Sequence, residues 1–180
     1  MPPVIHTIGH GRRPAAELVE YLLEASVETL VDVRRFPSSR RNPQFNQATL
    51  AATLADAGIS YVHASELGGL RTEEPGQELF ACLGQFAGYA ARMCTRSWQV
   101  ALDEALTQPA PCLMCAETPW QRCHRRLIAE LLGARGHEVV HLIQPGVRER
   151  HTAHPAAEIQ GGILHLCGQP VREVSGDPIR

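Results

Sequence analysis

The chain has 180 residues, of which 44% are hydrophobic and 20% are charged, and this balance is typical of one globular domain with its own core. The formal net charge of −2 argues against binding nucleic acid through an overall positive charge, although a local basic patch would still allow it. No apolar run reaches the length of about 18 residues that a membrane-spanning helix needs, so we expect no membrane partner.

The first residues, MPPVIHTIGHGRR, do not place a charged segment before an apolar one. We therefore expect no signal peptide and a cytoplasmic location. In a reducing compartment the six cysteines are expected to be thiols rather than disulfides.

Short apolar runs alternate with helical patterns along the chain. A strand is expected at Val4–Ile8, and a helix follows it with Pro14 in its first turn and an apolar stripe through Leu18 and Leu22. The further expected strands are Thr29–Val33, Ile59–His63, Cys112–Cys115 and Glu138–Ile143. The further expected helices are Gln47–Ala57, Glu78–Met93, Trp98–Leu106 and Arg122–Ala134.

This alternation predicts an α/β fold, with a mostly parallel five-stranded sheet between helices on both faces, as a Rossmann-like three-layer sandwich. Residues 1–145 are expected to form a single domain. Residues 146–180 are rich in proline and glycine and are expected to be a surface extension that packs on the domain or is partly disordered, with one strand at Ile163–Leu166. No GxGxxG motif is present, so we predict no dinucleotide site and name no cofactor.

Reactive and polar residues follow several of the expected strands. Since ligands of open parallel sheets bind at the carboxyl ends of the strands, these residues should share one site. They are Gly9 and His10 after the first strand, Asp32 and Arg34 at the second, Gly68, Gly69 and Arg71 after the third, and Cys115, Glu117, Cys123, His124 and Arg125 after the fourth.

Five short motifs in this order resemble a bacterial family, the domains of unknown function numbered 488. They are TIGH (Thr7–His10), LVDVRRFP (Leu30–Pro37), FN (Phe45–Asn46), LGGLR (Leu67–Arg71) and LMCAETPWQRCHR (Leu113–Arg125). CAE followed by CHR is the most specific of them. The family more usually has serine where this chain has Gly11. The resemblance supports the fold and the choice of site residues, and it leaves the reaction open.

Cys115 and Cys123 are candidate nucleophiles. A thiol at a strand end, near helix N-terminal amides and arginines, has a lowered pKa and is partly thiolate. Cysteine-dependent phosphatases and rhodaneses use such a turn, but their C-x5-R spacing is missed here by one residue. The alternative is that Cys115 is a small buried hydrophobe. His10, Glu117 and His124 are expected to take part in catalysis, with His10 and Glu117 moving protons.

Eight arginines gather at the same expected edge, namely Arg34, Arg35, Arg40, Arg41, Arg71, Arg122, Arg125 and Arg126. Arg34, Arg71 and Arg125 are predicted to bind an anion, because a guanidinium group makes bidentate contacts with phosphate and carboxylate. Asp32 would orient an arginine or His10. The expected substrate is therefore an anionic, phosphate-bearing small molecule or nucleotide, or a nucleic-acid end. The alternative is a nucleotide- or nucleic-acid-binding module without turnover.

Zinc binding is a third interpretation of the same residues. Cys115, Cys123 and His124, with His10 or His63, offer ligand atoms that zinc prefers. However, the spacing fits no common structural zinc site, and neighbouring Cys123 and His124 should diverge on a helix. We therefore assign no metal. The sequence does not predict an oligomeric state.

Overall fold

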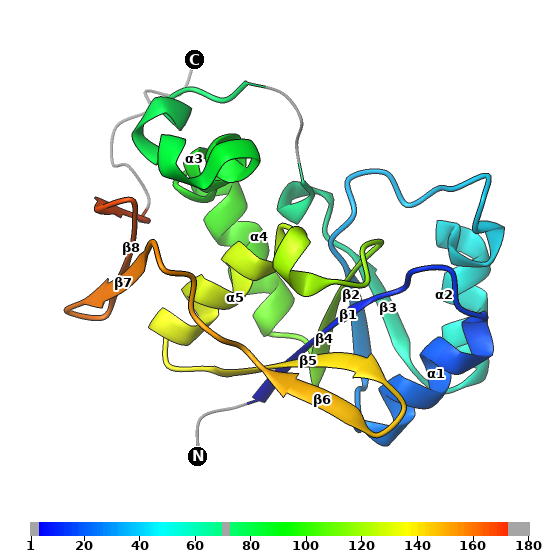
Figure 1. Cartoon of the computed structure of the whole chain (residues 1–180). Coiled ribbons are helices and arrows are strands. Elements are labelled where there is room, and N and C mark those ends of the chain that lie inside the picture. Colours follow the sequence, from blue (N-terminus) through cyan, green and yellow to red (C-terminus); the bar gives the residue numbers. More distant parts are fainter. Residues whose placement is uncertain (1–3, 70–72, 173–180) are drawn as a thin grey trace.

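A computed structural model describes residues 4–69 and 73–172 (Figure 1). Within these ranges six strands form the main sheet, in the order β3-β2-β4-β1-β5-β6. The strands are β1 (Val4–Gly9), β2 (Thr29–Asp32), β3 (Ser60–His63), β4 (Pro111–Cys115), β5 (Glu138–Gln144) and β6 (Val147–Arg150). The first five are parallel, and β6 is antiparallel to β5.

The α/β class and the mostly parallel sheet are confirmed. The sheet has one strand more than the expected five because a turn at Pro145-Gly146 returns the chain along β5. The glycine has φ +70°, a value that glycine adopts at no steric cost. The domain boundary at residue 145 remains a prediction, although β6 extends the main sheet beyond it.

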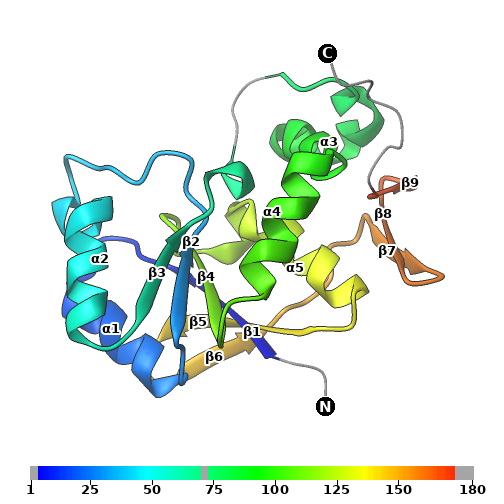
Figure 2. The same ribbon diagram turned by 180° about the vertical axis from the view of Figure 1, so that it is seen from behind.

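Helices lie on both faces of the sheet (Figures 1 and 2). One face carries α1 (Ala15–Glu24) and α2 (Gln47–Asp56), and the other carries α3 (Ala87–Met93), α4 (Arg96–Leu106) and α5 (Arg125–Ala134). Strand β4 is buried on both faces, since Met114 packs with α1 and α2 while Leu113 packs with α4 and α5. None of the described helices has the length and apolar character needed to cross a bilayer.

The expected helix Glu78–Met93 is confirmed over Ala87–Met93, which form α3, and is wrong before that. A 3-10 segment, η3 (Gln77–Phe86), precedes α3, and Gly84 at φ +55° and ψ −121° interrupts the helical geometry. The expected helix Arg122–Ala134 also starts too early. A short 3-10 turn, η4 (Trp120–Arg122), comes first, then Cys123 is extended, and α5 begins at Arg125. The loop before η3 contains another 3-10 turn, η2 (Ser65–Leu67).

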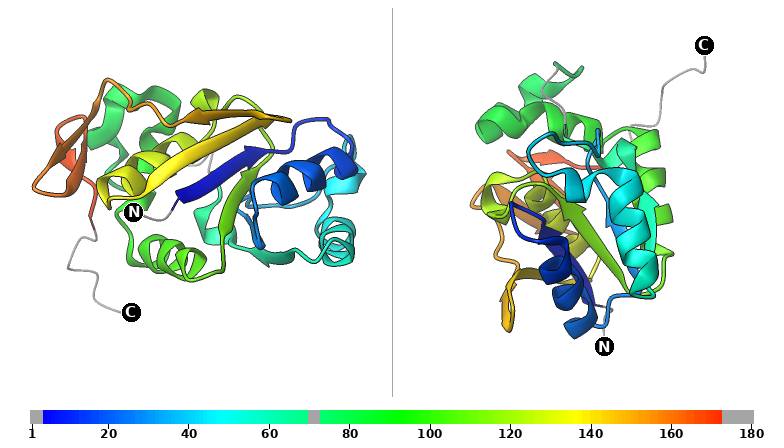
Figure 3. Two further views of the ribbon diagram at one scale, coloured as in Figure 1. Left: turned by 90° about the horizontal axis from the view of Figure 1, so that it is seen from below. Right: turned by 90° about the vertical axis from the view of Figure 1, so that its right-hand side faces the viewer.

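The C-terminal part forms a second, three-stranded antiparallel sheet of β7 (Ala157–Gln160), β8 (Ile163–Leu166) and β9 (Gln169–Pro170). It lies at the end of the molecule opposite α1 and α2 (Figure 3). The strand expected at Ile163–Leu166 is confirmed. Leu164 and Leu166 are buried in the core cluster that also contains residues of α4 and α5. This segment is therefore more than a surface extension.

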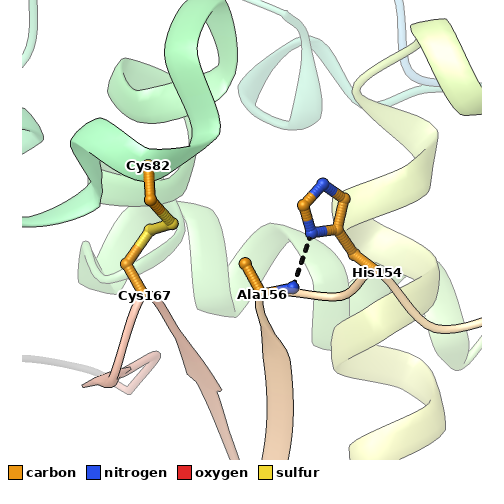
Figure 4. The surroundings of a disulfide bond; sticks show 4 residues. All are labelled: Cys82, His154, Ala156 and Cys167. Carbon is orange, nitrogen blue, oxygen red and sulfur yellow. Dashed lines mark hydrogen bonds between the residues drawn. A yellow bond between two sulfur atoms is a disulfide. The ribbon is translucent and has the colours of Figure 1, made fainter.

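A disulfide joins Cys82 of η3 to Cys167, which follows β8 (Figure 4). The expectation that all six cysteines are thiols is therefore wrong. All six lie in the described residues, and the free thiols are Cys94, Cys112, Cys115 and Cys123. Near the disulfide, Nδ1 of His154 accepts a hydrogen bond from the backbone N–H of Ala156 at 2.9 Å, where the chain enters β7. The disulfide links η3 covalently to the small sheet.

Candidate functional site: a buried thiol pair beside a pocket

Two cysteines meet at the carboxyl end of β4. Cys115 is the last residue of that strand, and Cys123 precedes α5. Their Sγ atoms are 2.6 Å apart, and each residue is 2% exposed. The strand–loop–helix turn predicted to hold the chemistry therefore brings two sulfur atoms into direct contact.

Arg125 contacts both sulfur atoms from the first turn of α5. Its Nε donates to Sγ of Cys115 at 3.1 Å, and its backbone N–H donates to Sγ of Cys123 at 3.5 Å. Its other side-chain donors reach Oγ1 of Thr7 at 3.0 Å and the carbonyl of Glu117 at 2.6 Å. The residue is 1% exposed, and within the described residues no carboxylate pairs with it. A buried cation needs a counter-charge, and here only the two sulfur atoms can carry one.

The pKa values of the two thiols move in opposite directions. Burial opposes ionisation of Cys123, but the hydrogen bond from Cys115 and the charge of Arg125 outweigh it and lower the pKa of Cys123 to about 7. Burial and the bond to Cys123 raise the pKa of Cys115 well above its ordinary value. The pair therefore shares one proton and one negative charge near neutral pH.

His124 points toward the same sulfur pair. Its Nε2 lies 3.2 Å from the carbonyl of Val33, which can only accept, so Nε2 carries the proton and Nδ1 faces Sγ of Cys123 at 3.7 Å. Burial lowers the pKa of His124, which favours the neutral ring. The expected divergence of Cys123 and His124 is wrong, because Cys123 is extended and lies outside the helix. The ligand atoms of Cys115, Cys123 and His124 all lie within 4.8 Å of one another.

A pocket of about 1190 Å³ lies beside the pair. Cys115 and His124 reach it, whereas Cys123 does not. Three further predicted residues also line it, namely Arg34, Gly69 and Glu117. Arg35 and Arg122, from the predicted cluster of arginines, line it as well. Most of the remaining wall was not predicted and comes from Phe36, Tyr89 and the segment from Glu73 to Gly88 that contains η3. The described lining residues include Arg34, Arg35 and Arg122 as well as Glu73, Glu78 and Glu117, so the pocket carries both signs of charge.

Arg34 is held by Asp32 in a buried ion pair. Its Nε and Nη2 donate to the two carboxylate oxygens at 2.8 and 2.5 Å, and Nη2 also donates to the carbonyl of Phe45 at 2.8 Å. The hydroxyl of Tyr61 donates to the same carboxylate at 2.7 Å. The predicted role of Asp32 in orienting an arginine matches this geometry. Much of the positive charge of Arg34 is thus already compensated.

His10 lies next to this ion pair rather than beside the thiols. Its Nδ1 is 2.8 Å from the carbonyl of Gly11 and therefore carries the proton, while Nε2 accepts from Nη1 of Arg34 at 3.2 Å. The ring stacks on Phe45 with centroids 4.3 Å apart. Burial lowers the pKa of His10 to about 4, so the ring is neutral at pH 7. Both ring nitrogens are engaged, and His10 does not line the pocket.

The profile of the family described as "Domain of unknown function DUF488" matches residues 14–132, which is more than half of the chain. The chain belongs to the DUF488 family. No curated protein and no solved structure matches it. The matched range contains the thiol pair and the ion pair of Asp32, whereas Gly9 and His10 lie before it. Arg71 lies outside the described residues.

A series of buried polar contacts connects Arg125 of the DUF488 thiol site with His151. Arg125 donates to Oγ1 of Thr7, whose hydroxyl can then donate to Nδ1 of His141 at 2.7 Å. Nε2 of His141 lies 3.0 Å from Nδ1 of His151. Nε2 of His151 lies 3.2 Å from the carboxylate of Glu130 but makes no hydrogen bond to it. The hydrogen-bonded part of this series therefore runs from Arg125 through Thr7 and His141 to His151.

Sequence patterns predict no role for His141, His151 or Glu130, and they place His151 in a surface tail. That placement is wrong, because the side chain of His151 is only 9% exposed. The ring of Trp120 stacks on His141 with centroids 4.2 Å apart, so the same turn that carries Cys123 also covers this contact chain. Pairing of β5 with β6 brings the two histidines together.

The three predicted glycines of the DUF488 site allow close packing of its segments. A Cβ atom on Gly9 would overlap the carbonyl group of Glu117, and one on Gly68 would lie 2.7 Å from the backbone nitrogen of Arg35. A Cβ atom on Gly69 would lie 3.1 Å from Nδ1 of His124. The absence of a side chain at each glycine therefore allows its backbone to lie against a residue that lines the pocket.

Gly9→Ala is expected to destabilise the fold by about 1–3 kcal/mol, since the added methyl group forces β1 away from the loop after β4. Gly133→Ala is the matched control. Gly133 lies inside α5, and a Cβ there meets nothing within 4 Å, so this change should stabilise by up to about 1 kcal/mol. Urea unfolding of both variants measures the difference. Equal effects would contradict the close approach at Gly9.

Proposed function

We propose that the chain is a cysteine-dependent enzyme, a hydrolase or transferase, in which a thiolate of the Cys115–Cys123 pair attacks a substrate that carries an anionic group. The observation that supports it most is the burial of Arg125 against two thiols without a carboxylate partner among the described residues. This environment favours a thiolate at neutral pH, and a thiolate is the form of cysteine that acts as a nucleophile.

The pocket favours particular residues for substrate binding. Arg34 is paired with Asp32, and Arg125 is enclosed among the sulfur atoms, Thr7 and the loop. Arg35 and Arg122 are exposed pocket residues, so we assign them the contacts with the anionic group of the substrate. Glu117 is also exposed at the pocket and is placed to exchange protons with a bound substrate.

The predicted anionic substrates, whether phosphate-bearing small molecules or nucleotides, remain part of the proposal. A cytoplasmic location also remains a proposal. The reduced thiols of the site favour it, whereas the Cys82–Cys167 disulfide is more typical of an oxidising compartment. The alternative class, a nucleotide- or nucleic-acid-binding module without turnover, requires no reactive thiol. The reactivity of the pair therefore separates the two.

Alkylation of the native protein with iodoacetamide is expected to modify one cysteine of the pair fastest, with a rate that follows a pKa near 7. Cys112 provides an internal control, because it is fully buried and burial raises its pKa. Peptide mapping after short exposures measures each rate. Equal rates at all free cysteines, or no reaction at the pair, would contradict the enzyme and favour the binding module.

Zinc binding is a second candidate, favoured by the close approach of Cys115, Cys123 and His124. The contact of His124 Nε2 with the carbonyl of Val33 resembles the outer support of zinc-binding histidines. Two thiolates bound to one tetrahedral zinc at about 2.3 Å would lie about 3.8 Å apart. The observed 2.6 Å would have to lengthen. Stoichiometric zinc in protein purified without added metal would favour this candidate.

A further inference from the structure

We infer that Cys115 and Cys123 are a redox pair that exchanges with small disulfides carrying anionic groups. This inference rests on the proposed thiolate nucleophile, and it specifies its reaction as thiol–disulfide exchange, with the two cysteines passing between the dithiol and an internal disulfide. In this reaction Cys115 attacks the substrate first and Cys123 attacks second. Oxidised glutathione is the test substrate for the pocket.

The separation of the sulfur atoms favours a bond between them. A disulfide bond is about 2.05 Å long, so the observed 2.6 Å requires a movement of only about half an ångström. The two residues belong to the end of a strand and to an extended residue before a helix, and both are packed in the core cluster that contains α5. The fold therefore holds the two thiols at reaction distance.

Access from the pocket distinguishes the two sulfur atoms. Cys115 lines the pocket, whereas Cys123 lies behind it. An incoming substrate therefore meets Cys115, and Cys123 is placed to attack the product of that first step. In a simple cysteine–histidine hydrolase, the sulfur that faces the histidine would also face the substrate. Here Nδ1 of His124 faces the inner sulfur, that of Cys123.

The charge of the pair can move to the outer sulfur. Arg125 donates to both sulfur atoms, and one proton lies between them, so transfer of that proton to Cys123 leaves the thiolate on Cys115 beside Nε of Arg125. The positive charge thus stabilises either arrangement.

The exchange then proceeds in two balanced steps. The thiolate of Cys115 attacks one sulfur of the substrate R–S–S–R, a mixed disulfide forms, and one RS⁻ leaves. Cys123 next loses its proton, for which Nδ1 of His124 is the neighbouring acceptor, and attacks the sulfur of Cys115, releasing the second RS⁻. Two electrons pass from the pair to the substrate, and the proton of the pair and one from water give two RSH. An excess of the small thiol reverses both steps and restores the dithiol.

Charges at the pocket indicate the kind of disulfide. Arg35 and Arg122 are exposed there, and neither has a carboxylate partner among the ion pairs of the described residues. Glu73, Glu78 and Glu117 add negative charge to the same pocket. A substrate that carries both carboxylate and ammonium groups would fit this mixture. Oxidised glutathione has both and is the probe for the test.

The test equilibrates the full-length protein with mixtures of reduced and oxidised glutathione at pH 7, quenches with acid and maps the disulfides by mass spectrometry. We expect a Cys115–Cys123 disulfide that appears and disappears reversibly with the glutathione ratio. In Cys123→Ser we expect glutathione to remain attached to Cys115, whereas Cys115→Ser should form no stable adduct at Cys123. Cys94→Ser is the matched control and should behave as the unmodified chain, because Cys94 is a free thiol outside the pair.

The possible outcomes separate this inference from the proposed function. Rapid alkylation of the pair without any Cys115–Cys123 disulfide, at any glutathione ratio, would overturn the redox inference and leave the nucleophile in place. Absence of both rapid alkylation and disulfide would overturn both. The first measurement uses the unmodified chain, so it does not depend on whether a variant folds. The Cys82–Cys167 disulfide gives separate peptides and does not obscure the result.

Discussion

Arg125→Met is expected to lower the alkylation rate of the thiol pair at pH 7 by about tenfold or more, since each unit of pKa changes the thiolate population about tenfold. The guanidinium group is the positive charge that contacts both sulfur atoms. Without it, burial remains and raises the pKa of the pair. Met keeps much of the packing volume, but the acceptors on Thr7 and Glu117 lose their donor, which should cost about 1–3 kcal/mol of stability.

The decisive measurement is the pH dependence of alkylation. In the unmodified chain the rate should be high above pH 7 and fall about tenfold per unit below it, because protonation removes the thiolate. In Arg125→Met the whole profile should shift to higher pH. Arg126→Met is the matched control on the same helix, since among the described residues the Arg126 side chain donates to the carbonyl of Gln121 at 3.4 Å and to neither sulfur atom. An unshifted profile in Arg125→Met would refute the electrostatic role of Arg125.

The sequence predicted the pocket residues that stand directly at strand ends. Arg34 follows β2, Cys115 ends β4 and Glu117 follows β4. The parallel direction of the two strands brings their ends to one edge. Apolar runs and helical periodicity are sufficient for this inference, because they fix strand direction and the order of elements. They do not fix where a side chain points, so His10 and Arg125 were placed at the right edge without their actual contacts.

The sequence did not predict most of the pocket wall or the polar contacts between Arg125 and His151, because these depend on contacts between residues that are far apart in the chain. The 3-10 geometry of η3 has no periodic signature, and Gly84 interrupts it in the middle of an otherwise helical pattern. His141 and His151 meet only after β6 folds back on β5. Likewise, Cys82 and Cys167 are 85 residues apart and pair only when the small sheet packs beside η3. Local patterns contain none of this information.

Asp32→Asn is expected to destabilise the fold by about 3–5 kcal/mol, the cost of removing one partner from a buried ion pair. Asp32 is fully buried, and its carboxylate accepts from Nε and Nη2 of Arg34, from the backbone N–H of Arg34 and from the hydroxyl of Tyr61. An asparagine at this position removes the negative charge. Its amide N–H group would also point at N–H or O–H donors of Arg34 or Tyr61, which need an acceptor. Arg34 would then remain buried with its positive charge uncompensated.

Because Arg34 also donates to His10, this loss should extend to the loop after β1. Asp103→Asn is the matched control. Asp103 forms an ion pair with Arg135 at 2.7 Å but is 64% exposed, so its replacement should cost about 0–1 kcal/mol. Urea unfolding of the two variants compares a buried pair with an exposed one of the same chemistry. A loss at Asp32 no larger than that at Asp103 would mean that the Asp32–Arg34 pair does not hold β2 and the pocket edge together.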